Sequence, residues 1–194
     1  MDLSIRAFGA GVKSPFGEYL HMPMHVNSTY GVIVVTSTIN CPLCGYRAVQ
    51  IRDRSEVYLI NCPRCGEFQI TRECLEDLPS ERKLLPQLMK VSAFTRYRTI
   101  NNEPIATLFI GNPNGRSEGY SIQTVVDQFP PVPERKLKAL QNLQGLSKYW
   151  GDAVSIVRED YAVFFPEVNE EQPSLMMMRT LVAEDLISGE VKFL

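Results

Sequence analysis

The segments CPLCG at residues 41–45 and CPRCG at residues 62–66 decide how this chain folds. Each is a Cys-x-x-Cys pair, and two such pairs at this separation are a strong signal for one tetrahedral Zn²⁺ bound by four thiolates. Each pair forms a tight turn that presents two sulfurs to a common point. The expected ligands are Cys41, Cys44, Cys62 and Cys65.

The other residues of the two segments suit such turns. Pro42 and Pro63 restrict φ inside each turn. Gly45 and Gly66 follow the second cysteine of each pair, where the backbone often needs a positive φ so that its amides can point at sulfur. The two halves of the motif therefore support the same interpretation.

Two other chemistries could use the same cysteines. The first is a pair of disulfides. No secretory signal is recognisable at the N-terminus, however, and such cysteine spacing in an intracellular protein is more typical of a metal site. Iron in a rubredoxin-like site is the other, because tetrahedral thiolate coordination suits both metals. Zinc is favoured, and its role is expected to be structural because four thiolates leave no coordination position for water or substrate.

Composition and charge place the chain among ordinary globular proteins. It has 194 residues, 44% hydrophobic content and a net charge of −2. Basic residues are in excess over 41–98 and acidic residues over 99–194. No apolar run has the length of a membrane span, so we expect a cytoplasmic protein without membrane contact.

Residues 1–40 are expected to form an N-terminal arm and a strand, the strand covering the β-branched run at 30–38. His21 and His25 are spaced so that a helix would place both imidazoles on one face, as in some metal sites. Pro23 between them argues against a regular helix, and the cysteine site already has four ligands.

Residues 41–78 are expected to form a small zinc ribbon of two hairpin-like turns and a sheet, stabilised largely by the metal. Residues 79–120 would add a helix and a connecting loop. The helix would run from a Ser80 N-cap to about Thr99, with Pro86 moving its start or causing a kink. Its apolar stripe would contain Leu84, Leu88, Val91 and Phe94, and Cys74 would be a packed or surface thiol.

Residues 121–194 are expected to form a winged-helix-like domain, so the fold class is α+β: a small four-cysteine zinc ribbon followed by a helical unit. The expected elements are a short helix from Ser121, a helix over 134–150, a strand over 154–157, an extended stretch over 161–165, a helix capped by Asn169 and a last strand over 190–194. Leu137, Leu140, Leu143 and Leu146 would form one apolar stripe, and three consecutive methionines, Met176 to Met178, would pack in the core or form an adaptable contact surface.

The order of these segments resembles a regulatory region of bacterial anti-phage defence proteins, in which a zinc ribbon and a winged-helix-like unit are joined to a TIR or other effector domain. The resemblance covers residues 41–188, and only the zinc motif is specific. It departs at two points: we expect no effector domain within these 194 residues, and the final unit lacks a second wing strand. The segments that carry it are CPLCG (41–45), NCPRCGEFQIT (61–71), SAFTRYRTINNEP (92–104), FPPVPERKLKALQNL (129–143) and EDYAVFFPEVNEEQPSLMMMRTLVAEDLIS (159–188).

The resemblance implies a non-enzymatic adaptor or regulatory subunit that binds an effector protein. A last strand without a second wing strand would be an edge that a partner completes. The sequence is also compatible with a homo-oligomer. An enzyme is disfavoured because carboxylates such as Asp127, Glu159 and Asp160 have no recognisable catalytic partner.

The alternative function is binding of DNA or RNA by the basic ribbon and the segment 80–98. The acidic last helix disfavours docking of that helix in a major groove. The residues expected to contact phosphates are Arg47, Arg52, Arg54, Arg64, Arg72, Lys90, Arg96 and Arg98.

Overall fold

A computed structural model describes residues 3–7, 35–52, 56–111, 119–149, 152–167 and 171–190. The predictions for His21, His25, Arg54 and Asn169 lie outside these residues, as do the strand at 30–34 and most of the loop after residue 111. Within the described part of the chain, no helix combines the length and the apolar character needed to cross a membrane.

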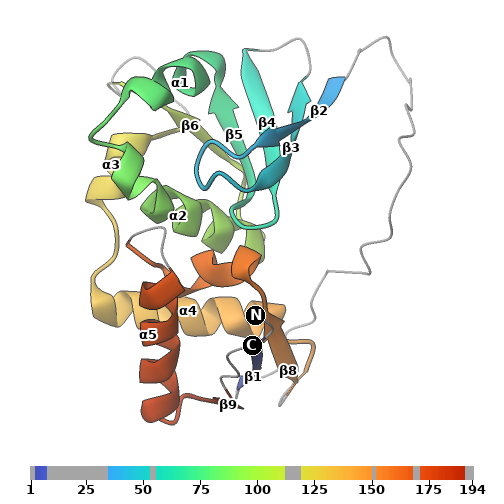
Figure 1. The fold of residues 1–194 in the computed structure, drawn as a ribbon, viewed down its shortest axis with the longest axis vertical. Helices are drawn as coiled ribbons and strands as arrows, with labels where there is room; N and C mark the ends of the chain where they lie inside the picture. Colours follow the sequence, from blue (N-terminus) through green and yellow to red (C-terminus); the bar gives the residue numbers. More distant parts are fainter. Residues whose placement is uncertain are drawn as a thin grey trace.

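The larger sheet contains the two cysteine turns. Its strands are β2 (Val35–Asn40), β3 (Arg47–Arg52), β4 (Val57–Cys62), β5 (Gly66–Thr71), β6 (Ala106–Phe109) and β7 (Tyr120–Ser121), in that order. The strands β2 to β5 form an antiparallel meander, and β6 and β7 extend the sheet in parallel. The connection from β5 to β6 carries α1 (Arg72–Asp77) and α2 (Leu88–Ile100), which lie with α3 (Ile122–Asp127) on one side of the sheet (Figure 1).

The helix α2 begins later than predicted. Two short 3₁₀ segments, Leu78–Ser80 and Leu85–Gln87, precede it, and each has a proline in its first turn. Proline has no N–H to donate and restricts the residue before it, so a regular α-helix starts only after Pro86. The expected apolar positions hold: Leu84, Leu88 and Val91 are buried.

The C-terminal part packs three helical elements against a small sheet. These elements are α4 (Val132–Leu146), the 3₁₀ helix η4 (Arg158–Phe164) and α5 (Glu171–Ala183). The stretch expected to be extended at 161–165 is therefore mostly helical, and Phe165 ends it in a left-handed conformation with φ of 52°. In the α4 stripe Leu143 is buried, whereas Leu137 is 58% exposed.

The small sheet has the order β8-β1-β9, with β8 (Ala153–Ile156) and β9 (Ile187–Glu190) on either side of β1 (Leu3–Ala7). Both pairings are antiparallel. The strand predicted over 190–194 lies outside the described residues except for Glu190, so the prediction of an unpaired last strand stays a prediction; the described strand β9 just before it is paired with the N-terminal strand β1. The mixed α+β class is confirmed, whereas the winged-helix-like character is not confirmed.

Two hydrophobic cores hold the elements together. The first contains the cysteine turns, the meander, α1, the start of α2 and α3, with Ile60, Phe68 and Ile70 fully buried. The second lies under α4, η4 and α5 and includes Ile100 from the end of α2. The helix α2 thus contributes to both cores. The four predicted domain ranges stay a prediction.

Candidate metal centre

Each cysteine turn has the backbone geometry expected from its sequence. In the first turn the Cys41 amide donates to the Tyr46 carbonyl at 2.7 Å, and the Gly45 amide donates to the Cys41 carbonyl at 2.8 Å. Gly45 and Gly66 have φ of 73° and 76°, in the left-handed region that favours glycine. The glycine that follows each pair therefore has the role predicted for it.

The two turns bring four sulfurs together. The Sγ atoms of Cys41, Cys44, Cys62 and Cys65 all lie within 4.8 Å of one another. The distance is 3.6 Å between the sulfurs of Cys41 and Cys65, and 3.7 Å between those of Cys44 and Cys62. A tetrahedron with Zn–S bonds of about 2.3 Å has edges of about 3.8 Å. The sulfurs are thus spaced as ligands of one metal ion.

The same distances bear on the alternatives. A disulfide needs an S–S distance of about 2.05 Å, and all five cysteines are free thiols in the structure. The fifth, Cys74, is buried and lies outside the tetrad, in the first turn of α1. Among the described residues the tetrad is the only group of three or more metal-ligating side chains that converge on a point. The identity of the metal does not follow from this geometry, because zinc and iron share it.

Burial and mutual hydrogen bonding set the ionisation of the four thiols. Cys41, Cys62 and Cys65 are buried and Cys44 is partly exposed. Hydrogen bonds with Cys44 and Cys62 raise the pKa of the Cys41 thiol, and burial raises the pKa of the Cys65 thiol well above its usual value. Hydrogen bonds with Cys41 lower the pKa of the Cys44 and Cys62 thiols. Their surroundings therefore oppose ionisation of the Cys41 and Cys65 thiols, and a cation among the four sulfurs would favour it.

One face of α2 contacts the second cysteine turn through small hydroxyl side chains. Ser92 Oγ lies 3.1 Å from Cys65 Sγ, and Thr95 Oγ1 donates to the Cys65 carbonyl at 2.9 Å. Thr99 Oγ1 accepts the amide hydrogen of Glu67 at 2.9 Å. Residues 92, 95 and 99 are spaced as neighbours on a helix surface. This polar stripe was missed in the sequence, although its i, i+3, i+7 spacing is a recognisable signal.

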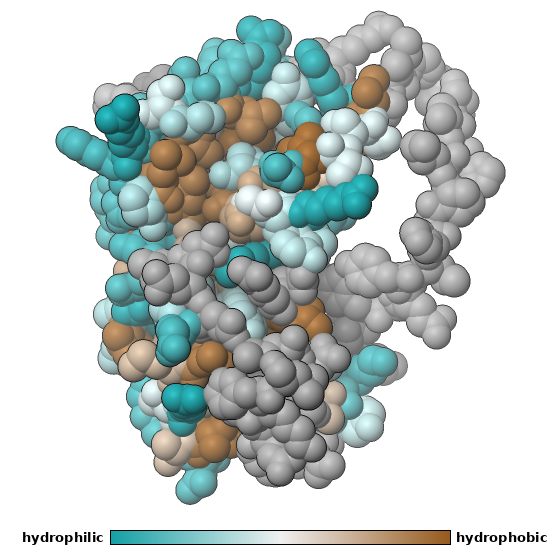
Figure 2. All heavy atoms as spheres, in the orientation of Figure 1, coloured by the Kyte–Doolittle hydropathy of each residue, from teal (hydrophilic) through white to brown (hydrophobic). Residues whose placement is uncertain are grey.

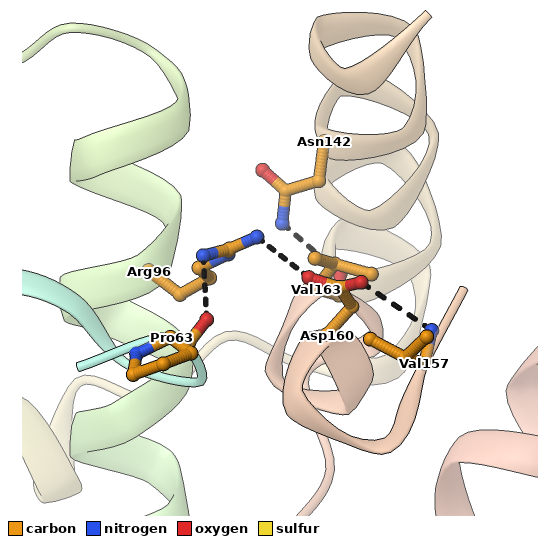
Figure 3. A network of polar contacts seen from close by, with 6 residues as sticks. All are labelled: Pro63, Arg96, Asn142, Val157, Asp160 and Val163. Carbon is orange, nitrogen blue, oxygen red and sulfur yellow. Dashed lines mark hydrogen bonds and ion pairs between the residues drawn. The ribbon is translucent and has the colours of Figure 1, made fainter. Parts of the chain in front are cut away.

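Arg96 extends this contact to the C-terminal part (Figure 3). Its guanidinium donates to the Pro63 carbonyl at 2.9 Å and to Asp160 Oδ1 at 2.8 Å. The other carboxylate oxygen of Asp160 accepts the amide hydrogen of Val157 at 3.3 Å, at the start of η4. The side chains of the pair are only 14% and 17% exposed, so the ion pair is partly shielded from water. Arg96 therefore connects the second cysteine turn directly to η4.

A cavity of about 750 Å³ lies beside this connection. It is formed by the second cysteine turn, the end of α2, the segment after it, and residues 146, 148, 157 and 160. Its charged lining residues carry both signs, among them Glu67, Arg98 and Lys148. It has no predominant charge that would select one class of ligand.

Most of the expected phosphate-contacting residues have protein partners. Arg72 pairs with Glu56 and Glu76, and Arg98 pairs with Glu103 and donates to the Pro104 carbonyl. Arg64 is only 5% exposed, with its Nε atom buried and unpartnered, and Arg52 lies over the Tyr58 ring. Arg47 is exposed on β3, and Lys90 lies over the Phe129 ring at 5.4 Å. Arg96 is bonded to Asp160, so most of the described members of this set already have partners within the protein.

The carboxylates weighed as catalytic residues are separately engaged. Asp160 is bonded to Arg96, and Asp127 accepts a hydrogen bond from Gln123 at 2.7 Å. The side chain of Glu159 lies outside the described part of the structure. The contact of Asp127 stays within α3, whereas that of Asp160 joins η4 to α2, and neither pairs the carboxylate with a nucleophile or a second titratable acid or base.

Comparison with family models, with curated proteins and with solved structures found no match to this chain.

Proposed function

We propose that this protein is a zinc-containing, non-enzymatic adaptor or regulatory subunit of a bacterial anti-phage system that binds an effector protein. The observation that carries the metal role is the enclosure of the four sulfurs. Four thiolates complete a tetrahedral shell, and α2 lies over the second turn through Ser92 and Thr95. Such a centre stabilises a fold and has no open position for a reacting molecule.

The contacts of α2 support a regulatory role. The second cysteine turn is bonded to α2, and Arg96 of α2 is bonded to Asp160 of η4. Metal binding therefore orders a continuous path from the ribbon to the C-terminal part. Exposed apolar side chains on that part, Leu137 at 58% and Met176 at 65%, are available to a protein partner.

Native mass spectrometry of the protein co-expressed with its genomic neighbours tests this proposal. We expect one zinc ion per chain in a complex with a second protein. Cys44→Ser should lose the metal, whereas Cys74→Ser, outside the tetrad, should retain it. A metal-free native chain would contradict the metal role, and a zinc-loaded chain without any protein partner would contradict the adaptor role.

A cluster of cations and aromatic rings favours nucleic-acid binding as the second candidate. The buried Phe165, only 3% exposed, packs between Tyr97 and Phe129 at centroid distances of 5.8 and 6.2 Å, and these two outer rings are partly exposed. Lys138 lies 4.2 Å from the Tyr97 ring centre, and Lys90 lies over Phe129. Lysines beside aromatic rings are typical of single-strand binding surfaces.

Titration of a labelled single strand at several salt concentrations tests the second candidate. We expect Lys138→Ala to weaken binding and to reduce its salt dependence. Lys148→Ala is the matched control, since this exposed lysine follows α4 and lies outside both the ring cluster and the segment 80–98. Equal effects of the two substitutions would contradict a binding surface on the cluster.

A further inference from the structure

The strand β2 forms an edge of the six-stranded sheet. Among the described elements it pairs only with β3, from Val35 opposite Arg52 to Asn40 opposite Arg47. Five of its six residues are exposed. Its backbone groups on the side away from β3 therefore have no strand partner in the described part of the chain.

The register identifies which residues present those groups. The hydrogen bond from the Cys41 amide to the Tyr46 carbonyl places residue 41 in a hydrogen-bonded pair of the hairpin. Because such pairs alternate along an antiparallel ladder, residues 39, 37 and 35 also bond toward β3. Thr36, Thr38 and Asn40 consequently direct their N–H and C=O groups outward.

This edge lacks the features that normally prevent pairing. The β2 sequence VTSTIN has no charged residue and no proline. Four of its six residues are β-branched, namely Val35, Thr36, Thr38 and Ile39. Figure 2 shows white and brown residues at this margin, bordered by hydrophilic ones. An uncharged, β-branched edge strand is a template for a further strand.

We propose that β2 pairs antiparallel with β2 of a second copy of this chain, joining the two sheets into one. With Thr38 opposite Thr38 of the second copy, Thr36 lies opposite Asn40 of that copy, and the reverse pair forms by symmetry. All three outward residues then bond at once, with about six backbone hydrogen bonds in total.

Charge and symmetry both suit pairing with a second copy of this chain. The register is self-complementary, and each outward residue meets another neutral one. The nearest basic side chains, Arg47 and Arg52, lie on β3, one strand further in on each copy. No like charges face each other across the twofold axis, so the pairing carries no electrostatic penalty.

Sedimentation velocity of the full-length protein from low to high micromolar concentration tests this proposal. We expect a dimer for the native chain. Thr38→Lys and Thr38→Glu should each be monomeric, because each places two like charges opposite one another at the axis. An equimolar mixture of the two variants should restore dimers containing one of each, which an unfolded variant could not form.

Two matched variants control for effects on the sheet. Thr38→Val keeps the backbone and the neutral strand, so it should remain dimeric. Val49→Lys places the same charge at an exposed position opposite Thr38 on β3, one strand away from the axis, and should also remain dimeric.

Hydrogen exchange of the native chain gives a measurement without substitutions. The amides of Thr36, Thr38 and Asn40 should become more protected as the protein concentration rises. A native chain that stays monomeric and unprotected at every concentration would overturn the proposal and leave this edge to a strand of another protein. A dimer that persists in both charged variants would also overturn it, because its interface would lie elsewhere.

Discussion

Alanine substitutions at two equivalent glycines test how closely α2 approaches the second cysteine turn. Gly45 and Gly66 follow the second cysteine of their turns and have similar positive φ values of 73° and 76°. A Cβ added at Gly45 meets nothing within 4 Å. A Cβ added at Gly66 would lie 2.2 Å from Thr99 Oγ1 and 2.7 Å from Thr99 Cβ. Substitution by alanine therefore adds the same backbone strain at both positions but a clash only at Gly66.

The structure sets the magnitude of the difference. The left-handed conformation costs a residue with a Cβ about 1–2 kcal/mol, so Gly45→Ala should lower the free energy of unfolding by about that amount. Gly66→Ala should cost about 2–4 kcal/mol more. Overpacking against Thr99 contributes about 1–3 kcal/mol, and displacing the hydroxyl that accepts the Glu67 amide hydrogen contributes about 1 kcal/mol.

Thermal unfolding of the two variants and the native chain, each loaded with metal, is the assay. For a chain of this size about 1 kcal/mol corresponds to about 2–4 °C, so Gly66→Ala should melt about 4–16 °C below Gly45→Ala. Metal content measured on the same samples separates loss of the site from loss of packing. Equal melting temperatures for the two variants would refute the close contact between α2 and the second turn.

Three further predictions concern the metal centre and its connection to η4. Chelation of the metal should loosen the two cysteine turns and reduce the protection of their amides in hydrogen exchange, because the metal holds the four sulfurs of these turns together; an unchanged exchange pattern would contradict a structural role. Metal affinity should fall as pH falls, because burial raises the pKa of the Cys65 thiol and the metal must displace its proton. Competition with a chromophoric chelator between neutral and mildly acidic pH measures this affinity. A pH-independent affinity would contradict thiolate ligation. Arg96→Ala should cost about 2–3 kcal/mol, since it leaves the shielded carboxylate of Asp160 without its cation, and should speed hydrogen exchange in η4. A double-mutant cycle with Asp160→Asn should give a coupling energy of about 1–2 kcal/mol, and a value near zero would contradict the ion pair.

The cysteine tetrad was predictable because its information is local. Two short turns each carry their own cysteines, proline and glycine, and the turn geometry follows from those residues alone. The strands β3, β4 and β8 were recognisable from alternating or β-branched runs for the same reason. Pro86 likewise marked the point before which α2 could not be a regular helix.

The partners of these elements depend on contacts between distant residues, and only the tertiary structure decided them. The pairing of β1 with β8 and β9 joins the two ends of the chain, and no local pattern specifies it. Arg96 was expected from the sequence to contact phosphates, but folding places Asp160 and the Pro63 carbonyl beside it. Local sequence specifies which conformations a segment favours, whereas the neighbours of a charged side chain follow from how whole elements pack.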